Sequence, residues 1–446
     1  MAGQAQLLWK VLHWIGGPPL AAVILSTGIY LMARYRFLPL RRFGSAFRLT
    51  FGSLFSSPRK QLSAGDISPY QALTTALAAT VGTGNIAGVA TAITLGGPGA
   101  IFWMWVSALF GLAIKFSEIV LAVYFRRRAA GGYIAGGPMY VLEQGLHSRW
   151  LGLWFAFFAS LAAFGIGNLV QANSAAAIAR KVWGLPPLLT GLVLAFITAA
   201  VILGGIERIG SFTSRLIPLM ALLYIGGAVI ILVLRYQQIP LALAEIFKGA
   251  VTGRAAAGGF AGAGMLQALR YGAARGVFSN EAGLGSASIA HAAAKTDHPV
   301  RQGLWGIMEV FIDTHLVCTV TGLVIIVTGA WTTTLEGASL TAEAFARGLH
   351  GPGEMIVGIG LLLFAFSTLI SWSYYGEKSF EYLTGGGQVF YRLLWAGLVV
   401  LGATGQLRQL WALADALNAM MAFPNLVGVL SLSGLVIKLN RQFWKH

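Results

Sequence analysis

The sequence predicts an all-α integral membrane protein of eleven transmembrane helices, with one extra N-terminal helix followed by a five-plus-five inverted repeat. Hydrophobic residues make up 57% of the 446 residues and charged residues only 10%, a balance that the surface of a soluble domain does not tolerate. The mean hydropathy is +0.72. The apolar residues gather in runs of about 20, the length that crosses a bilayer as a helix. Two of these runs are interrupted by glycines at matching positions.

Eleven apolar runs are the candidate transmembrane helices. They lie near residues 12–32, 68–93, 99–125, 151–178, 186–205, 212–234, 260–292, 302–330, 353–375, 389–403 and 409–436. The tenth run is short and the seventh is interrupted. Helices are favoured over a β-barrel because the runs are continuous, whereas barrel strands alternate apolar and polar residues. An odd number of helices places the two termini on opposite sides of the membrane.

The first run is interpreted as a retained helix. It continues well past the length of a signal-peptide core, and no small-residue cleavage site precedes the basic loop that follows it. The single cysteine, Cys318, provides no disulfide framework.

The net charge of +16 is spread along the loops, so a basic soluble domain for nucleic acid is not expected. When loops are assigned to alternate sides, nineteen Lys and Arg residues fall on one side and eight on the other. Seven of the nineteen lie in the first loop: Arg34, Arg36, Arg41, Arg42, Arg48, Arg59 and Lys60. Because basic loops stay in the cytoplasm, the N-terminus is expected outside the cell and the C-terminus inside.

Ten helices remain when the first is set aside, and they divide into two groups of five. Residues 1–64 would then hold the N-terminal helix and a basic cytoplasmic loop, residues 65–235 the first repeat, and residues 236–446 the second repeat and the C-terminal tail. Five helices per group is an odd number. The second group therefore points the opposite way from the first.

The first helix of each group carries a break. The sequence is TVGTGNIAG at residues 80–88 and ARGVFSNEAGLGSAS at 274–288. Glycines in membrane helices often serve only close packing between helices, but packing does not need the polar residues that accompany these: Thr83, Asn85, Ser279, Asn280 and Glu281. Broken helices at matching positions of two halves indicate a transporter binding site at the bilayer midplane.

Five blocks in order along the chain resemble the alanine or glycine:cation symporter family. They are GTGNIAGVATAI followed by GGPGAIFWMW, then GGPMYVLEQGL, VFSNEAGLGSASIAHAAAKTDHPVRQG and FSTLISWSYYGEKSFEYL. The resemblance covers residues 65–436. It implies the fold of LeuT-type sodium symporters and sodium-coupled uptake of small neutral amino acids, alanine or glycine, across a prokaryotic inner membrane. It implies no enzymatic activity and no cofactor, with the sodium ion acting only as the coupling ion.

The same resemblance implies a sodium site between the first break and the ninth helix. Its ligands would be the backbone carbonyls of Ala78, Val81 and Phe364 and the hydroxyls of Ser367 and Thr368. Helical spacing places Phe364, Ser367 and Thr368 on one face. Without the resemblance, these hydroxyls would be expected to bond back to the preceding turn.

The substrate site implied by the resemblance surrounds the first break. N–H groups near Thr83 and Gly84 would hold the carboxylate at a half-helix N-terminus, where the helix dipole is positive. Gln171 would line the pocket, with an interhelical hydrogen bond as its alternative role. Phe278 and Trp372 would close over the small side chain. The full expected set is Thr80, Gly82, Thr83, Gly84, Asn85, Gln171, Phe278 and Trp372.

Several charged residues inside the predicted helices have no partner that the sequence can assign. They are Lys115, Glu118, Arg270, Arg275, Glu281, Glu309, Asp313 and Asp415, and such groups in membranes are usually functional. Lys115 and Glu118, three residues apart, are one possible pair. Two other function classes are less favoured: a channel needs a filter repeated about an axis, and no His pair has the HExxH spacing of a metalloenzyme. Proton coupling remains an alternative to sodium coupling.

Overall fold

The computed structural model describes residues 17–52, 64–129, 131–252, 261–405 and 410–445. In this part of the chain the named elements are helices except for one two-residue antiparallel pair, β1 (Arg127–Arg128) with β2 (Ile134–Ala135). An isolated parallel bridge also joins Ile67 to Ala294. The first half comprises α2 (Pro18–Arg34), α3 (Leu38–Arg41), α4 (Phe43–Gly52), α5 (Pro69–Thr80), η1 (Gly84–Gly88), α6 (Val89–Gly96), α7 (Gly99–Tyr124), α8 (Pro138–Tyr140), η2 (Val141–Gly145), α9 (Arg149–Ala162), η3 (Ala163–Leu169), α10 (Val170–Trp183), α11 (Pro187–Ile202) and α12 (Gly205–Leu234).

The second half is helical in the same way. It comprises η4 (Tyr236–Gln238), α13 (Ile239–Thr252), α14 (Ala261–Asn280), α15 (Ser286–Ala292), α16 (Pro299–Val310), η5 (Phe311–Cys318), α17 (Thr319–Val327), η6 (Ala330–Thr332), α18 (Gly337–Leu349), α19 (Pro352–Thr384), α20 (Gln388–Thr404), α21 (Leu410–Ser431) and α22 (Ser433–Phe443). Every predicted apolar run whose residues are described coincides with a helix or with two helices separated by a break.

Six helices in the described residues are long and apolar enough to cross a membrane, and the bent pair α5 and α6 makes a seventh. The six are α7, the continuous helix Arg149–Trp183, α12, the continuous helix Pro299–Val327, α19 and the last span Leu413–Ser431. Three shorter apolar helices, within α2, α11 and α20, accompany them. The protein is therefore a multi-pass membrane protein, and the count of eleven spans remains a prediction.

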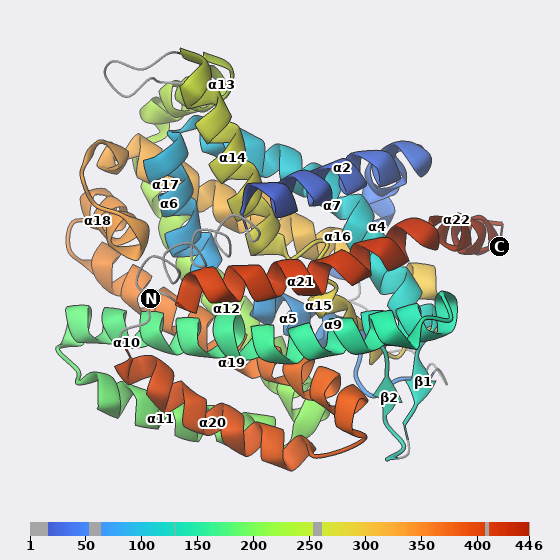
Figure 1. Ribbon diagram of the computed structural model, residues 1–446. Coiled ribbons are helices and arrows are strands. Elements are labelled where there is room, and N and C mark those ends of the chain that lie inside the picture. The colour runs from blue at the N-terminus through green and yellow to red at the C-terminus, as the bar shows by residue number, and fades with distance from the viewer. Residues whose placement is uncertain (1–16, 53–63, 130, 253–260, 406–409, 446) are drawn as a thin grey trace, which may run out of the picture.

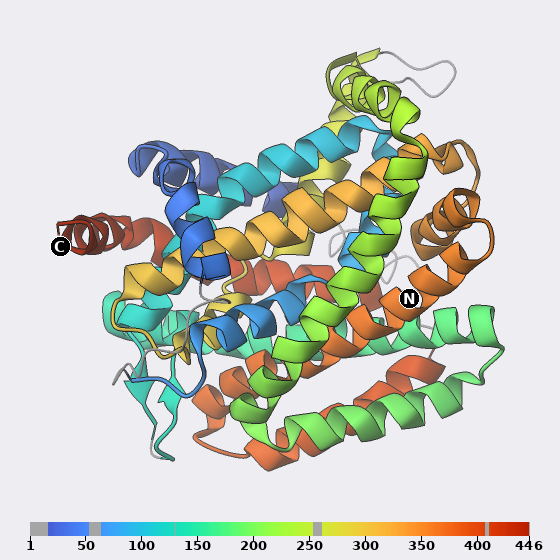
Figure 2. The same cartoon turned by 180° about the vertical axis from the view of Figure 1, so that it is seen from behind.

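The long helices pack side by side around the broken ones. α7 contacts α14 and α16, while α9 contacts α19 and α21. α11 and α20 form an outer pair along one side of the molecule (Figure 1). The same arrangement is seen from behind in Figure 2, where α22 and the β1–β2 pair lie at one end of the bundle and α18 at the other.

Helices also form in stretches that lie outside the predicted runs: α3, α4, α13, α18 and most of α22. They are too short and too polar to span a bilayer, and they bury only one side. In α18, for example, Leu340 and Phe345 are buried and the Thr341 hydroxyl donates to the carbonyl of Ile86 in η1 at 3.0 Å. α18 thus covers the first helix break.

Candidate functional site

The first break lies between α5 and η1, where the two arms of the helix bend by 52°. α5 begins firmly at a capping box in which Ser68 and Gln71 bond each other's backbone, and it ends at Thr80. In a continuous helix the N–H of Gly82 would donate to the carbonyl of Ala78. Here it donates to Oδ1 of Asn85 at 2.9 Å. The break therefore releases the Ala78 carbonyl from its helical partner.

The second break separates α14 from α15. Glu281, Gly283 and Gly285 all have positive φ, at 54°, 99° and 80°, a region that a residue with a side chain adopts at a cost. The freed N–H groups of Gly283 and Gly285 donate to Oε1 of Glu118 at 2.9 and 3.1 Å. A carboxylate of the protein itself therefore occupies the N-terminal end of α15.

A small cavity lies between the two breaks. Its volume open to the centre of a water molecule is ≈ 20 Å³, about what one buried water needs. Its lining includes seven of the eight predicted substrate residues: Thr80, Gly82, Thr83, Gly84, Gln171, Phe278 and Trp372. The other lining residues are Ala79, Ile166, Glu281, Leu284 and Thr368. Four segments that are distant in the sequence therefore converge on one point.

Two buried polar atoms of the cavity residues have no hydrogen-bond partner within the described parts of the chain. They are Oγ1 of Thr83 and Oε1 of Gln171, whereas Nε2 of Gln171 donates to the carbonyl of Ile166 at 3.0 Å. Leaving a buried polar atom unpaired costs about 1–3 kcal/mol. These atoms can therefore receive a polar ligand at little desolvation cost.

Asn85 is the predicted substrate residue that does not line the cavity. Besides accepting from Gly82, its amide donates to Oδ1 of Asp313 at 2.8 Å and to the Ser279 hydroxyl at 3.1 Å. The Ser279 hydroxyl in turn donates to Oδ2 of Asp313 at 2.8 Å. Asn85 thus fixes the first break to the second break and to η5.

The predicted sodium ligands lie beside the cavity. The hydroxyls of Ser367 and Thr368 both donate to the carbonyl of Phe364 at 2.9 Å. The Thr368 hydroxyl also lies 3.5 Å from the carbonyl of Ala79, the residue after the predicted ligand Ala78. The structure therefore brings α19 against the end of α5, with the hydroxyl oxygens turned toward backbone carbonyls.

A buried charge network that the sequence analysis could not assign continues from the cavity. Nζ of Lys115 on α7 lies 3.1 Å from Oε1 of Glu309 on α16. Nε2 of His291 contacts the other oxygen of Glu309 at 3.0 Å, and Gln302 contacts Nδ1 of His291 at 2.8 Å. The side chains of Lys115, Glu309 and His291 are fully buried. Lys115 therefore pairs across helices with Glu309, and its sequence neighbour Glu118 instead binds the second break.

Glu281 lines the cavity and interacts electrostatically with Lys115 of the network. Its Oε1 accepts from the indole N–H of Trp372 at 2.9 Å, and its other oxygen accepts from the Ser286 hydroxyl at 2.5 Å. The sequence marked Glu281 as an intramembrane charge but gave no signal for these partners. Trp372, one of the predicted pocket aromatics, is thereby oriented by the hydrogen bond that its indole N–H donates to the second break.

Comparison with known proteins gives a family that matches the whole chain. The model of the sodium:alanine symporter family matches residues 1–446. The sodium/alanine symporter AgcS of Methanococcus maripaludis is 50% identical over 446 residues, covering 98% of this chain and 96% of the relative. The probable sodium/glutamine symporter GlnT of Bacillus subtilis is 37% identical over 443 residues, covering 99% of this chain and 89% of that protein.

Solved structures share the fold at low sequence identity. MhsT in complex with L-phenylalanine matches with a TM-score of 0.60 at 14% identity, covering 84% of this chain and 89% of that chain. Mhp1, a nucleobase-cation-symport-1 family transporter, matches with a TM-score of 0.50 at 14% identity, covering 86% and 80%. The described helices therefore adopt a LeuT-like transporter arrangement.

Proposed function

The chain belongs to the sodium:alanine symporter family, and from that premise we propose that it carries small neutral amino acids, alanine or glycine, into a prokaryotic cell together with sodium. The observation that carries the proposal is the cavity between the two breaks, where seven residues expected to bind substrate meet. The eleven-helix arrangement with a five-plus-five inverted repeat belongs to the same proposal. It is supported by the matching positions of the two breaks.

The substrate carboxylate would bind at the first break. The amides of the second break already donate to Glu118, whereas the Thr83 hydroxyl has no partner among the described residues and lies beside the N-terminus of η1. A helix N-terminus attracts anions. The unpaired Oε1 of Gln171 is an acceptor for the substrate ammonium group.

The pocket aromatics would set the size limit. Phe278 and Trp372 line the cavity, and a methyl group added at Gly84 would lie 3.6 Å from the Phe278 ring. A methyl group added at Gly167 would lie 2.3 Å from Cβ of Trp372, so the backbone of η3 holds this tryptophan in place. The pocket would accept the methyl group of alanine and reject leucine sterically.

Sodium would bind where α5 meets α19. Sodium is a hard ion that needs several oxygen ligands, and the candidates are the carbonyls of Ala78, Val81 and Phe364 with the hydroxyls of Ser367 and Thr368. The diverted Gly82 N–H supports a free Ala78 carbonyl. Because the ion and the substrate would share the first break, each should tighten the binding of the other by the same factor.

Uptake of radiolabelled alanine into proteoliposomes tests the proposal. A sodium gradient should drive concentrative uptake, while potassium alone should not. Transport of one sodium ion with a zwitterion carries one positive charge, so an inside-negative potential should favour uptake. The electrical driving force is about 2.3 kcal/mol per 100 mV.

The alternatives give different results in the same assay. Uptake driven by a pH gradient without sodium would indicate proton coupling, and one relative is named a putative sodium/proton-dependent alanine carrier. If glutamine competes better than alanine, the substrate is glutamine, as the name of the glutamine symporter above states for that protein. Full uptake in a potassium-only medium would contradict sodium coupling.

A further inference from the structure

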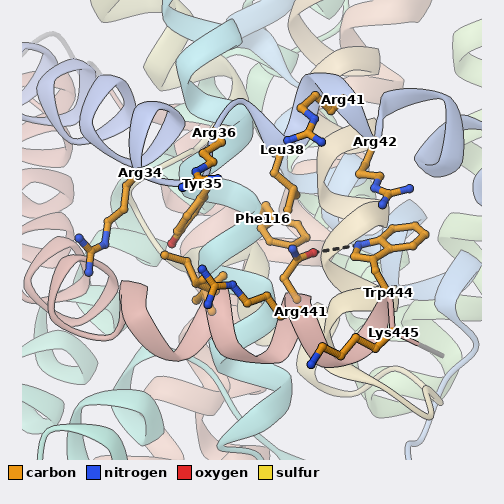
Figure 3. A pocket seen from close by; sticks show the side chains of 13 residues that line it. Arg34, Tyr35, Arg36, Leu38, Arg41, Arg42, Phe116, Arg441, Trp444 and Lys445 are labelled. Carbon is orange, nitrogen blue, oxygen red and sulfur yellow. Dashed lines mark hydrogen bonds between the residues drawn. The ribbon is translucent and has the colours of Figure 1, made fainter.

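A basic pocket lies at one end of the molecule, far along the chain from both helix breaks. It has ≈ 560 Å³ of space open to water-sized molecules and lies between the segment Arg34–Arg42 and helix α22. Figure 3 shows Arg34, Arg36, Arg41 and Arg42 on one side and Arg441 with Lys445 on the other. Six cationic side chains therefore surround a single space, and no acidic residue lines it.

None of these cations has a neutralising partner in the described part of the chain. In residues 17–52 and in every other described segment, no carboxylate lies within 4.0 Å of Arg34, Arg36, Arg41, Arg42, Arg441 or Lys445. Five of the six are exposed and Arg42 is half-buried. Like charges gathered around one pocket repel each other, so an anion that enters it is stabilised by all of them.

The backbone is held in an unfavourable conformation to form this pocket. Arg36 and Phe37 are consecutive non-glycine residues in the left-handed region, with φ of 52° and 57°. Their N–H groups bond the carbonyls of Ala33 and Met32 at 2.9 Å each, which reverses the chain at the end of α2. The reversal places arginines from both sides of the turn around the same space, and such strain often marks a functional site.

The floor of the pocket is apolar and its aromatic polar atoms are already satisfied. Leu38, Phe116, Val436 and Ile437 contribute to the lining. The Tyr35 hydroxyl bonds Ser117 at 2.8 Å, and the Trp444 indole donates to Asn440 at 2.9 Å. The Trp444 ring also stacks against the Arg42 guanidinium, whose carbon lies 3.7 Å from the ring centroid. The groups of the pocket that remain available to a ligand are therefore its positive charges and its apolar surface.

The pocket begins where an apolar helix ends, and the boundary between hydrocarbon and headgroups is expected at such an end. The apolar helix α2 ends at Arg34, where the pocket begins. Three large side chains on the adjoining segment, Phe37, Leu40 and Phe47, are 52%, 39% and 47% exposed. None of the three lines the pocket, but exposed apolar side chains close in sequence to these arginines fit a molecule that carries both an anionic group and acyl chains.

We propose that this pocket binds the headgroup of an anionic phospholipid from the surrounding bilayer. The phosphate lies among the arginines, and the acyl chains run along the apolar surface of Phe37, Leu40 and Phe47. Basic pockets at membrane interfaces recognise anionic headgroups through the same chemistry. The apolar surface favours a lipid over a soluble phosphate, because a free phosphate leaves that surface exposed to water.

Native mass spectrometry of the delipidated full-length protein in detergent tests this site without requiring transport. Phosphatidylglycerol is the probe, phosphatidylcholine is the zwitterionic comparison, and glycerol 3-phosphate is the soluble headgroup. The protein should bind phosphatidylglycerol in preference to phosphatidylcholine. Millimolar glycerol 3-phosphate should not displace the lipid. Equal binding of both lipids, or displacement by glycerol 3-phosphate, overturns the proposal, the latter in favour of a soluble-anion site.

Variants distinguish lipid binding in the pocket from a general effect of the protein's positive charge. The triple variant Arg36→Gln, Arg41→Gln and Arg441→Gln should weaken phosphatidylglycerol binding about a hundredfold, since each interfacial cation contributes about fivefold. The same three positions changed to Lys should keep most of the affinity. The matched control Arg208→Gln, Arg215→Gln and Lys248→Gln removes three exposed cations outside the pocket. Its affinity for phosphatidylglycerol should stay within twofold of that of the wild type.

Two results for the variants overturn the proposal. One is an unchanged affinity in the triple glutamine variant, and the other is an equal loss in the matched control. If the triple variant is not monodisperse, the single change Arg441→Gln on the exposed side of α22 replaces it. A loss of about fivefold is then expected, and an unchanged affinity counts against the site.

Discussion

At the scale of single residues, the Thr368 hydroxyl is the proposed sodium ligand whose removal tests the ion site. It lies 2.9 Å from the Phe364 carbonyl and 3.5 Å from that of Ala79. Thr368→Ala should raise the sodium concentration for half-maximal uptake about tenfold or more, since a lost polar contact to a charged group costs about 1.5–3 kcal/mol. Alanine affinity at saturating sodium should change less. Sodium-dependence curves in proteoliposomes provide the measurement.

The matched control for Thr368 is Ser373→Ala on the same helix. The Ser373 hydroxyl donates to the Ile370 carbonyl at 2.6 Å, and Ser373 is not among the cavity residues. Its removal should leave sodium dependence unchanged. Wild-type sodium dependence in Thr368→Ala would remove this residue from the proposed site.

Trp372 is the residue expected to limit substrate size. Trp372→Ala should open space beside the cavity, so that leucine begins to compete with labelled alanine for uptake. One methylene changes affinity by only about 1–3 kcal/mol, so the variant's gain in affinity should differ stepwise between valine and leucine. Trp372→Phe keeps a ring but loses the hydrogen bond to Glu281, and should retain the preference for small substrates. Wild-type protein that accepts leucine as well as alanine would contradict the size limit.

At the scale of elements, the first break depends on close approach between α19 and the residues that link α5 to η1. A methyl group added at Gly82 would lie 2.7 Å from Oγ1 of Thr368, and overpacking of this kind costs about 1–3 kcal/mol. Gly82→Ala should therefore reduce uptake about tenfold or more while the protein still folds.

Gly88→Ala is the control within the same break. A methyl group there would meet only the side chain of Arg275, at 3.9 Å, which is ordinary contact distance. Uptake should remain near that of the wild type. Equal losses in Gly82→Ala and Gly88→Ala would show that helix propensity, and not contact with Thr368, decides the effect.

The buried ion pair joins α7 to α16. Lys115→Met leaves Glu309 buried without its cation and should destabilise the protein by about 3–5 kcal/mol. The double variant Lys115→Met with Glu309→Gln should recover much of this loss. Thermal unfolding in detergent measures both. Lys181→Gln breaks a pair whose side chains are 46% exposed and should cost less than about 1 kcal/mol. No recovery in the double variant would contradict the assigned pairing.

At the scale of the whole molecule, the distribution of basic residues predicts orientation. A tag after His446 should be accessible to an impermeant label only from the cytoplasm, and a tag before Met1 only from outside. Both tags labelled from the same face would contradict the odd number of spans. α22 lies at one end of the bundle (Figures 1 and 2) and lines the basic pocket. Because the C-terminus that follows α22 is expected inside the cell, the pocket is expected on the cytoplasmic side.

The sequence by itself determined the long apolar helices and the two breaks, because a bilayer requires long apolar runs and each helix closes its own hydrogen bonds. It also identified, through its resemblance to a family, seven residues that line the cavity. These signals are local, since each depends on residues close together in the chain. The polar residues within the breaks were visible for the same reason.

Only the tertiary structure decided which distant groups meet. Lys115 and Glu309 are paired across 194 positions, and spacing on one helix had suggested Glu118 instead. Asn85 turns toward Asp313 and away from the cavity, although its neighbours line it. The basic pocket joins the end of α2 to α22 near the opposite terminus. Such contacts depend on how helices pack, and the partner of a buried charge is set by three-dimensional distance, which no local pattern encodes.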